Sequence, residues 1–127
     1  MTAYGQSKTA NILFAVEADR RYRAEGIRAF SLHPGAFLDT QLTRHYDPGE
    51  LKAVVERSKQ ISTFKTIEQG AATTVFAATS PLLDGTGGAY LADCDIAKVG
   101  DGDHDVRPFA IDPDIAKRLW TWTEALL

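Results

Sequence analysis

A tyrosine and a lysine stand close together near the start of the sequence, as Tyr4 and Lys8 in the stretch YGQSKTAN. If this stretch is helical, residues four apart share one face, and the phenol and the ammonium group lie side by side. An ammonium group close to a phenol favours the phenolate form. Such a phenol could exchange a proton with a reacting carbonyl or hydroxyl oxygen. The ammonium group also offers three donors to a polar ligand such as a sugar hydroxyl.

The spacing of the pair does not show whether it is functional, because a tyrosine and a lysine on an ordinary helix surface can have the same spacing. The elements around the pair must therefore be considered. Apolar residues recur at helical spacing behind the pair, and we predict one long helix over residues 4–25. Gly26 suits the C-cap of this helix. A strand-like run over 27–32 follows directly and is stopped by Pro34-Gly35. A helix followed at once by a strand indicates an α/β fold.

The rest of the chain continues this alternation. We predict a loop with a short helix near 40–44, helices that begin near Pro48 and after an N-cap at Thr66, and a strand over 89–92. A polar loop and a closing helix follow, and the apolar stripe of that helix is formed by Ile115, Leu119, Trp122 and Leu126. The two strands are separated by helices, so they should pair in parallel. Two parallel strands do not make a stable sheet alone, and we interpret the chain as half of a larger sheet.

Composition narrows the function classes. The chain has 127 residues, which is enough for one domain. Its net charge of −3 does not indicate nucleic-acid binding, which usually requires a positively charged surface. One cysteine excludes an intrachain disulfide, and no apolar run is long enough for a membrane span. We therefore expect a cytoplasmic protein with no membrane span. The acidic run over 101–105 lacks the spacing of a calcium loop, so we predict a solvated turn and no metal site.

The stretch YGQSKTANILFAVEADRRYRAEGIRAFSLHPG resembles the short-chain dehydrogenase/reductase family, most closely its retinol-dehydrogenase-like and WW-domain-oxidoreductase-like branch. GTGGAYLADCDIA resembles that branch's last strand, and IDPDIAKRLWTWTEALL resembles its closing helix. The resemblance covers nearly the whole chain. It implies that 1–127 form the C-terminal half of a Rossmann-type doubly wound parallel sheet, with two strands and their flanking helices present and the N-terminal strands missing.

The resemblance also implies an NAD(P)-dependent oxidoreductase that transfers hydride between the cofactor and a carbonyl or alcohol. Tyr4 would be the catalytic acid/base and also a cofactor contact. Lys8 would assist it in catalysis and bind the ribose hydroxyls of the nicotinamide half. Pro34 and Gly35 would line the nicotinamide side of the cleft. Whether the cofactor is NAD or NADP is not readable from these residues.

Two further assignments rest on the same resemblance. The substrate-binding segment would span 36–60, and its apolar residues Phe37, Leu38 and Leu42 suit a small lipophilic carbonyl or alcohol substrate. Thr40 would be a further cofactor contact. The family commonly places this threonine one residue earlier, where this chain has Asp39.

Parts of the family pattern are absent from the 127 residues. No Gly-x-x-x-Gly-x-Gly turn for phosphate binding occurs, and there is no place for the family's catalytic serine before the tyrosine. We therefore interpret the chain as truncated and expect no dehydrogenase activity from it alone. The alternative is a non-catalytic remnant that acts as a binding or oligomerisation module, and a homo-oligomer is one assembly this allows. The third hypothesis is an unrelated small α/β domain in which the Tyr-x-x-x-Lys motif occurs by accident.

Overall fold

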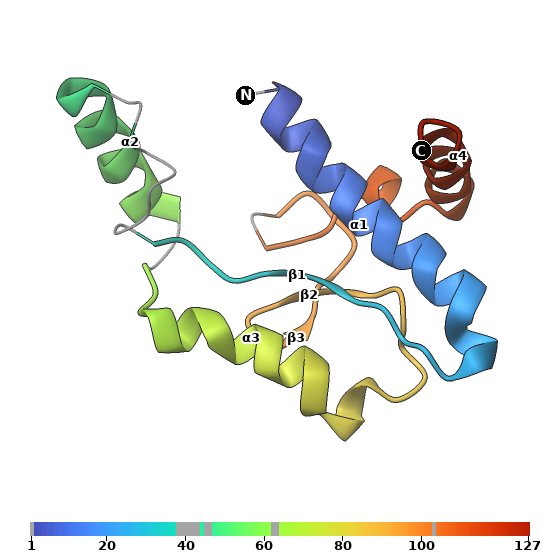
Figure 1. Ribbon diagram of the computed structural model, residues 1–127. Helices are drawn as coiled ribbons and strands as arrows, with labels where there is room; N and C mark the ends of the chain where they lie inside the picture. Colours follow the sequence, from blue (N-terminus) through green and yellow to red (C-terminus); the bar gives the residue numbers. More distant parts are fainter. Residues whose placement is uncertain (1, 38–43, 45–46, 62–63, 103) are drawn as a thin grey trace.

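The protein is a small α/β structure in which helices lie on both faces of a mixed sheet (Figure 1). The computed structural model describes residues 2–37, 44, 47–61, 64–102 and 104–127. Three strands form the sheet in the order β1-β2-β3. The α/β class predicted from the sequence is confirmed.

The long helix predicted at the start of the chain is α1, which spans Thr2–Tyr22. The short 3-10 helix η1 (Arg23–Glu25) follows, and Gly26 closes it with a φ of 81°. This left-handed conformation is easily adopted by glycine, and it turns the chain from α1 towards the sheet. The chain then runs back along β1 (Ser31–His33). The carboxyl end of β1 therefore lies beside the first turns of α1.

The sheet pairs β1 with β2 (Tyr90–Ala92) in parallel, with Leu32 opposite Leu91. The predicted parallel pairing is therefore confirmed, although both strands begin later than the sequence indicated. Leu91 is completely buried and marks the centre of the core. Other buried apolar residues come from α1, from the segment before β2, from β2 itself and from the chain beyond it: Leu13, Ala15, Ala18, Leu83, Ala92, Val106, Ala110 and Ala116.

A third strand, β3 (Asp95–Ile96), pairs antiparallel with β2 in a region that the sequence had indicated to be a polar loop. The expectation of two strands was wrong at this point. Asp93 and Cys94 form the tight turn between β2 and β3 with φ values of 53° and 60°. Two-residue turns with positive φ at both positions are usually made by Asn-Gly or Asp-Gly. An Asp-Cys pair carries no such signal, so the hairpin was missed.

Helix α3 (Ile67–Thr79) packs against β1 and β2 on the face opposite α1 (Figure 1). Its predicted N-cap is confirmed: the Thr66 side chain accepts from the Gln69 N–H, and the Gln69 side chain accepts from the Thr66 N–H. Pro81 begins the next short 3-10 helix, η3 (Pro81–Leu83). Helix α2 (Pro48–Ile61) lies beyond the carboxyl end of β1 (Figure 1).

The closing helix α4 (Pro113–Glu124) follows the 3-10 helix η4 (Pro108–Ala110) and packs along α1. The apolar stripe predicted for it was wrong for three of its four residues, and only Leu119 is half-buried. Ile115, Trp122 and Leu126 are exposed, whereas Ala116 is 1% exposed and Trp120 is half-buried. The packed face is therefore rotated from the stripe that the apolar spacing suggested, because the small Ala116 allows α4 to approach α1 closely.

Within the described part of the chain, no helix has both the length and the apolar character needed to cross a membrane.

Candidate functional site

The side chains of Tyr4 and Lys8 share one face of α1, as their spacing predicts. The ammonium group of Lys8 lies 5.2 Å from the centre of the Tyr4 ring. The Tyr4 side chain is half-exposed, and its phenol is therefore accessible to a ligand. The Ser7 hydroxyl donates to the Tyr4 carbonyl at 2.7 Å within the same turn.

An open groove of about 870 Å³ runs between α1 and β1. Tyr4 and Lys8 line it from the helix, and Asn11, Ile12 and Ala15 continue that wall. The strand side is formed by residues 28–35. The groove thus brings together five residues assigned by sequence, which come from two separate stretches: Tyr4, Lys8, Pro34, Gly35 and Phe37. The other assigned residues, Leu38, Thr40 and Leu42, lie outside the described residues.

The turn at the carboxyl end of β1 requires glycine. Gly35 has a φ of 99°, a conformation that residues with a side chain rarely adopt. A methyl group at this position would also collide with the aliphatic part of the Lys65 side chain. The Gly35 N–H donates to Nδ1 of His33 at 3.1 Å. The backbone of this turn therefore borders the groove with no side chain to obstruct it.

A cluster of charged side chains, formed by Lys65, Asp93 and His104, adjoins this turn at the carboxyl ends of β1 and β2. The Lys65 ammonium group hydrogen-bonds Asp93 Oδ1, and His104 Nδ1 lies 3.3 Å from Asp93 Oδ2. The bond from Lys65 lowers the pKa of Asp93. Burial, followed by the charges of Lys65 and His104, lowers the pKa of His33. Sequence reasoning missed this cluster, because 28 residues separate Lys65 from Asp93.

Two fully buried carboxylates lie on α1. Glu17 is fully buried, and its carboxylate accepts from Arg20 at 2.6 and 2.7 Å and from Arg21 at 2.8 Å. The bond from Arg20 lowers the pKa of Glu17 to about 2. The spacing of Glu17 and Arg21 is a recognisable helical ion-pair signal.

The second carboxylate, Asp19, joins α1 to the chain that leads into β1. It is fully buried and accepts from the Arg28 side chain at 2.9 Å and from the Ala29 N–H at 3.3 Å. Because both bonds reach the residues just before β1, Asp19 fixes the strand relative to the helix that carries Tyr4 and Lys8. No short-range sequence signal identifies this pairing.

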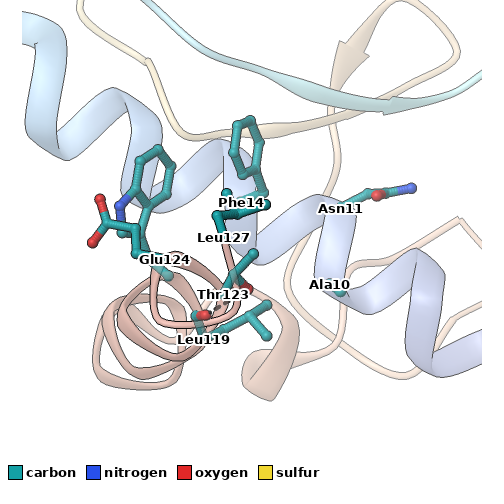
Figure 2. Close-up of a pocket in the computed structure, with 8 residues that line it drawn as sticks. Ala10, Asn11, Phe14, Leu119, Thr123, Glu124 and Leu127 are labelled. Atoms are coloured by element: carbon teal, nitrogen blue, oxygen red, sulfur yellow. Dashed lines mark hydrogen bonds between the residues drawn. The ribbon is translucent and has the colours of Figure 1, made fainter.

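A second, smaller pocket of about 260 Å³ lies between α1 and α4 (Figure 2). Phe14 and Trp120 stack there with ring centres 5.1 Å apart, and Leu119 and Leu127 complete its apolar lining. Among the described residues, Glu124 is the only charged side chain that lines it. This pocket contains none of the residues assigned by sequence, so the groove is the candidate site.

No family model matches the chain. Curated proteins nevertheless match nearly all of it. The chain is 45% identical to a probable oxidoreductase of Streptomyces lividans, over 94% of this chain and 43% of the relative. It is 41% identical to the short-chain dehydrogenase/reductase prx1 of Penicillium roqueforti, over 93% of this chain and 36% of the relative. It is 36% identical to the chloroplastic short-chain dehydrogenase TIC 32 B of Brassica napus, over 98% of this chain and 36% of the relative.

The chain therefore belongs to the short-chain dehydrogenase/reductase family and corresponds to the C-terminal part of a family member. The family assignment made from the sequence is confirmed. The chain spans 36% to 43% of the length of these three relatives. The sheet is accordingly part of a Rossmann-type fold.

Proposed function

We propose that this chain supplies the acid/base part of an NAD(P)-dependent oxidoreductase site that interconverts a carbonyl and an alcohol. The observation that carries the proposal is the shared groove: Tyr4 and Lys8 lie on one wall, and Pro34 and Gly35 lie at the end of the other. The oxidoreductase names of the relatives support the same reaction class.

The described groove fits the nicotinamide half of such a cofactor. Lys8 offers ammonium donors for ribose hydroxyls, and the turn at Gly35 exposes backbone without a side chain. Nothing in the 127-residue sequence provides the glycine-rich turn that would hold the pyrophosphate. When bound, the nicotinamide supplies hydride chemistry at the carbonyl carbon.

The protein's own part in reduction is proton transfer. The Tyr4 hydroxyl donates its proton to the substrate oxygen, and the resulting phenolate regains a proton from solvent. In the oxidative direction the phenolate accepts the proton of the alcohol. Lys8 places positive charge beside the phenol, where negative charge develops during the transfer.

A small lipophilic carbonyl or alcohol is the substrate class that the groove favours. Phe37 lines the groove next to the Pro34-Gly35 turn, and it supplies an apolar surface in the same groove as Tyr4 and Lys8. Leu38 and Leu42 remain proposed substrate contacts from the sequence, and Thr40 a proposed cofactor contact.

A hybrid oxidoreductase tests the proposal. In this hybrid, the 127-residue chain replaces the matched region of the Streptomyces lividans relative. We expect the hybrid to oxidise NADH or NADPH with members of an aldehyde panel, and the isolated chain to give no turnover above blank. A folded hybrid that binds the cofactor but shows no turnover would contradict the proposed reaction. Turnover by the isolated chain would contradict its dependence on the remainder of the fold.

A further inference from the structure

The chain directly before α3 runs beside the turn that ends one wall of the groove. Ala36 and Phe64 form an isolated parallel bridge, and the Lys65 N–H donates to the Ala36 carbonyl at 2.9 Å. These backbone contacts come immediately after Pro34 and Gly35, which line the groove. They hold Lys65 next to a turn that borders the proposed position of the nicotinamide.

The side chain of Lys65 extends across this turn. Its aliphatic carbons lie so close to Gly35 that a single methyl group at Gly35 would collide with them. Its ammonium group continues to Asp93, with which it forms a hydrogen bond and an ion pair. Only 21% of the Lys65 side chain is exposed, although lysine is a residue that is rarely buried. The side chain therefore spans from the start of α3 to the end of β2, with the Gly35 backbone against its middle.

Asp93 is a well-placed anchor for the ammonium group. The register of the sheet sets His33 opposite Ala92, so Asp93 follows β2 at the same edge as the turn that follows β1. A hydrogen bond from Lys65 lowers the pKa of Asp93, which keeps the carboxylate ionised at neutral pH. Its second oxygen lies 3.3 Å from His104 Nδ1. Both carboxylate oxygens are thus engaged from outside the turn.

Most ion pairs on an exposed surface contribute little to stability. The pair of Lys65 and Asp93 differs from these because the backbone of Gly35 lies against the carbon chain that leads to the ammonium group. The pair also joins segments that are 28 residues apart in the sequence. Breaking it would therefore release the side chain that closes over the turn, in addition to separating two charges.

The next part of the same segment is also seated on α3. The ring of Phe37 lies directly against Gly70, which is buried and leaves no room for a side chain. Gly35 and Phe37 are thus restrained two residues apart, the first by Lys65 and the second by the surface of α3. The position of this side of the groove is accordingly set by α3 and the residue that precedes its N-cap.

We propose that Lys65 is a positioning residue, which together with Asp93 clamps the Pro34-Gly35 turn in the place where the groove accepts a nicotinamide ring. This inference rests on the proposed function. Lys65 is not among the described residues that line the groove, so it acts through the backbone of Gly35. Because a small misplacement of reacting groups sharply reduces the rate, loss of the clamp should reduce hydride transfer more than cofactor affinity.

Variants of the hybrid oxidoreductase test the clamp. Lys65→Met keeps most of the aliphatic contact with Gly35 and removes the charge. Asp93→Asn removes the partner charge, and asparagine tolerates the left-handed backbone at this position. Each variant should lower kcat by at least about tenfold and change Kd for NADH or NADPH by less than about threefold. The double variant should lose no more than either single variant, because both changes remove the same interaction.

Two further variants separate the clamp from a general loss of charge or stability. Lys65→Arg keeps a cation that can pair with Asp93 and should retain kcat within about threefold of the wild type. Lys117→Met removes an exposed lysine from α4 and should leave kcat unchanged. Wild-type kcat in Lys65→Met would overturn the proposal, and so would independent, multiplying losses in the double variant.

Amide exchange in the same hybrid reads the clamp without any turnover. The Gly35 N–H donates to His33 Nδ1, and the Gly26 N–H donates to the Arg23 carbonyl as an internal reference. Lys65→Met should speed exchange at Gly35 by at least about fivefold and leave Gly26 unchanged. Unchanged exchange at Gly35 would overturn the proposal even if kcat fell. A wild-type hybrid that shows no turnover, but in which Gly35 responds to Lys65→Met, would refute the proposed function and support the clamp.

Discussion

The ammonium group of Lys8 lies over the face of the Tyr4 ring, 5.2 Å from its centre. This arrangement is a favourable cation–π contact between the two side chains. Both side chains line the groove that ends at Pro34 and Gly35. The pair is thus assembled by α1 alone, whereas the opposite wall depends on how β1 is fixed to α1.

The first prediction concerns Lys8. In the hybrid oxidoreductase, Lys8→Met should raise KM for the cofactor and lower kcat/KM by about a hundredfold, because it removes both the ribose contact and the positive charge beside the phenol. Lys52→Met, on an exposed position of α2, is the control and should change neither. Steady-state kinetics measure both, and a Lys8→Met hybrid with wild-type kinetics would exclude the proposed role.

The second prediction concerns the glycine turn. Gly35→Ala should destabilise the hybrid by more than the roughly 1–2 kcal/mol that a left-handed conformation costs a residue with a side chain, because Lys65 must also move. Gly26→Ala is the matched control, since Gly26 has a φ of 81° but open space around it. Urea unfolding measures both changes. An equal decrease in the free energy of unfolding for the two variants would show that the contact with Lys65 is unimportant.

The third prediction links His33 to the same turn. The Gly35 N–H donates to His33 Nδ1, which must therefore carry no proton. Burial lowers the pKa of His33 below its ordinary value of 6.5, so the neutral ring and the bond persist at and above that pH and are lost as the pH falls further. The amide resonance of Gly35 should shift with a midpoint below pH 6.5, while that of Gly26 stays constant. A Gly35 shift with a midpoint above pH 6.5 would contradict this.

The fourth prediction concerns acid stability. The bond from Arg20 lowers the pKa of Glu17 from 4.5 to about 2 in the folded chain. Ionised Glu17 therefore stabilises the fold at pH values above 4.5, and this stabilisation is lost as the pH falls towards 2. Glu17→Gln should lower Tm at pH 7 and reduce the loss of Tm between pH 5 and pH 2. Glu56→Gln, at an exposed position on α2, is the control. An unchanged pH dependence in Glu17→Gln would refute the assignment.

Local signals in the sequence were sufficient for the elements that carry the site. The apolar spacing behind Tyr4 predicted α1, and Thr66 as an N-cap predicted the start of α3. The separation of the two strands by helices predicted their parallel pairing. Each of these features depends on residues that are close in the chain or on a general rule of topology.

The features that the sequence did not predict depend on tertiary contacts. Asp19 is buried because Arg28 and the Ala29 N–H reach it across the turn after α1. The packed face of α4 is set by how closely Ala116 approaches α1, and the apolar spacing alone suggested a different stripe. The pairing of Lys65 with Asp93 exists only because the sheet brings their segments together. No pattern of neighbouring residues encodes these relationships.

The most direct test of the account is the Tyr4→Phe variant of the hybrid oxidoreductase, with Tyr22→Phe at the other end of α1 as the control. Removing one hydroxyl group should lower kcat by at least about a hundredfold, with cofactor binding preserved, because a positioned general acid contributes on the order of 10²–10⁴ to the rate. Tyr22→Phe should leave kcat unchanged. A Tyr4→Phe hybrid that turns over as fast as the Tyr22→Phe hybrid would show that Tyr4 is not the acid/base.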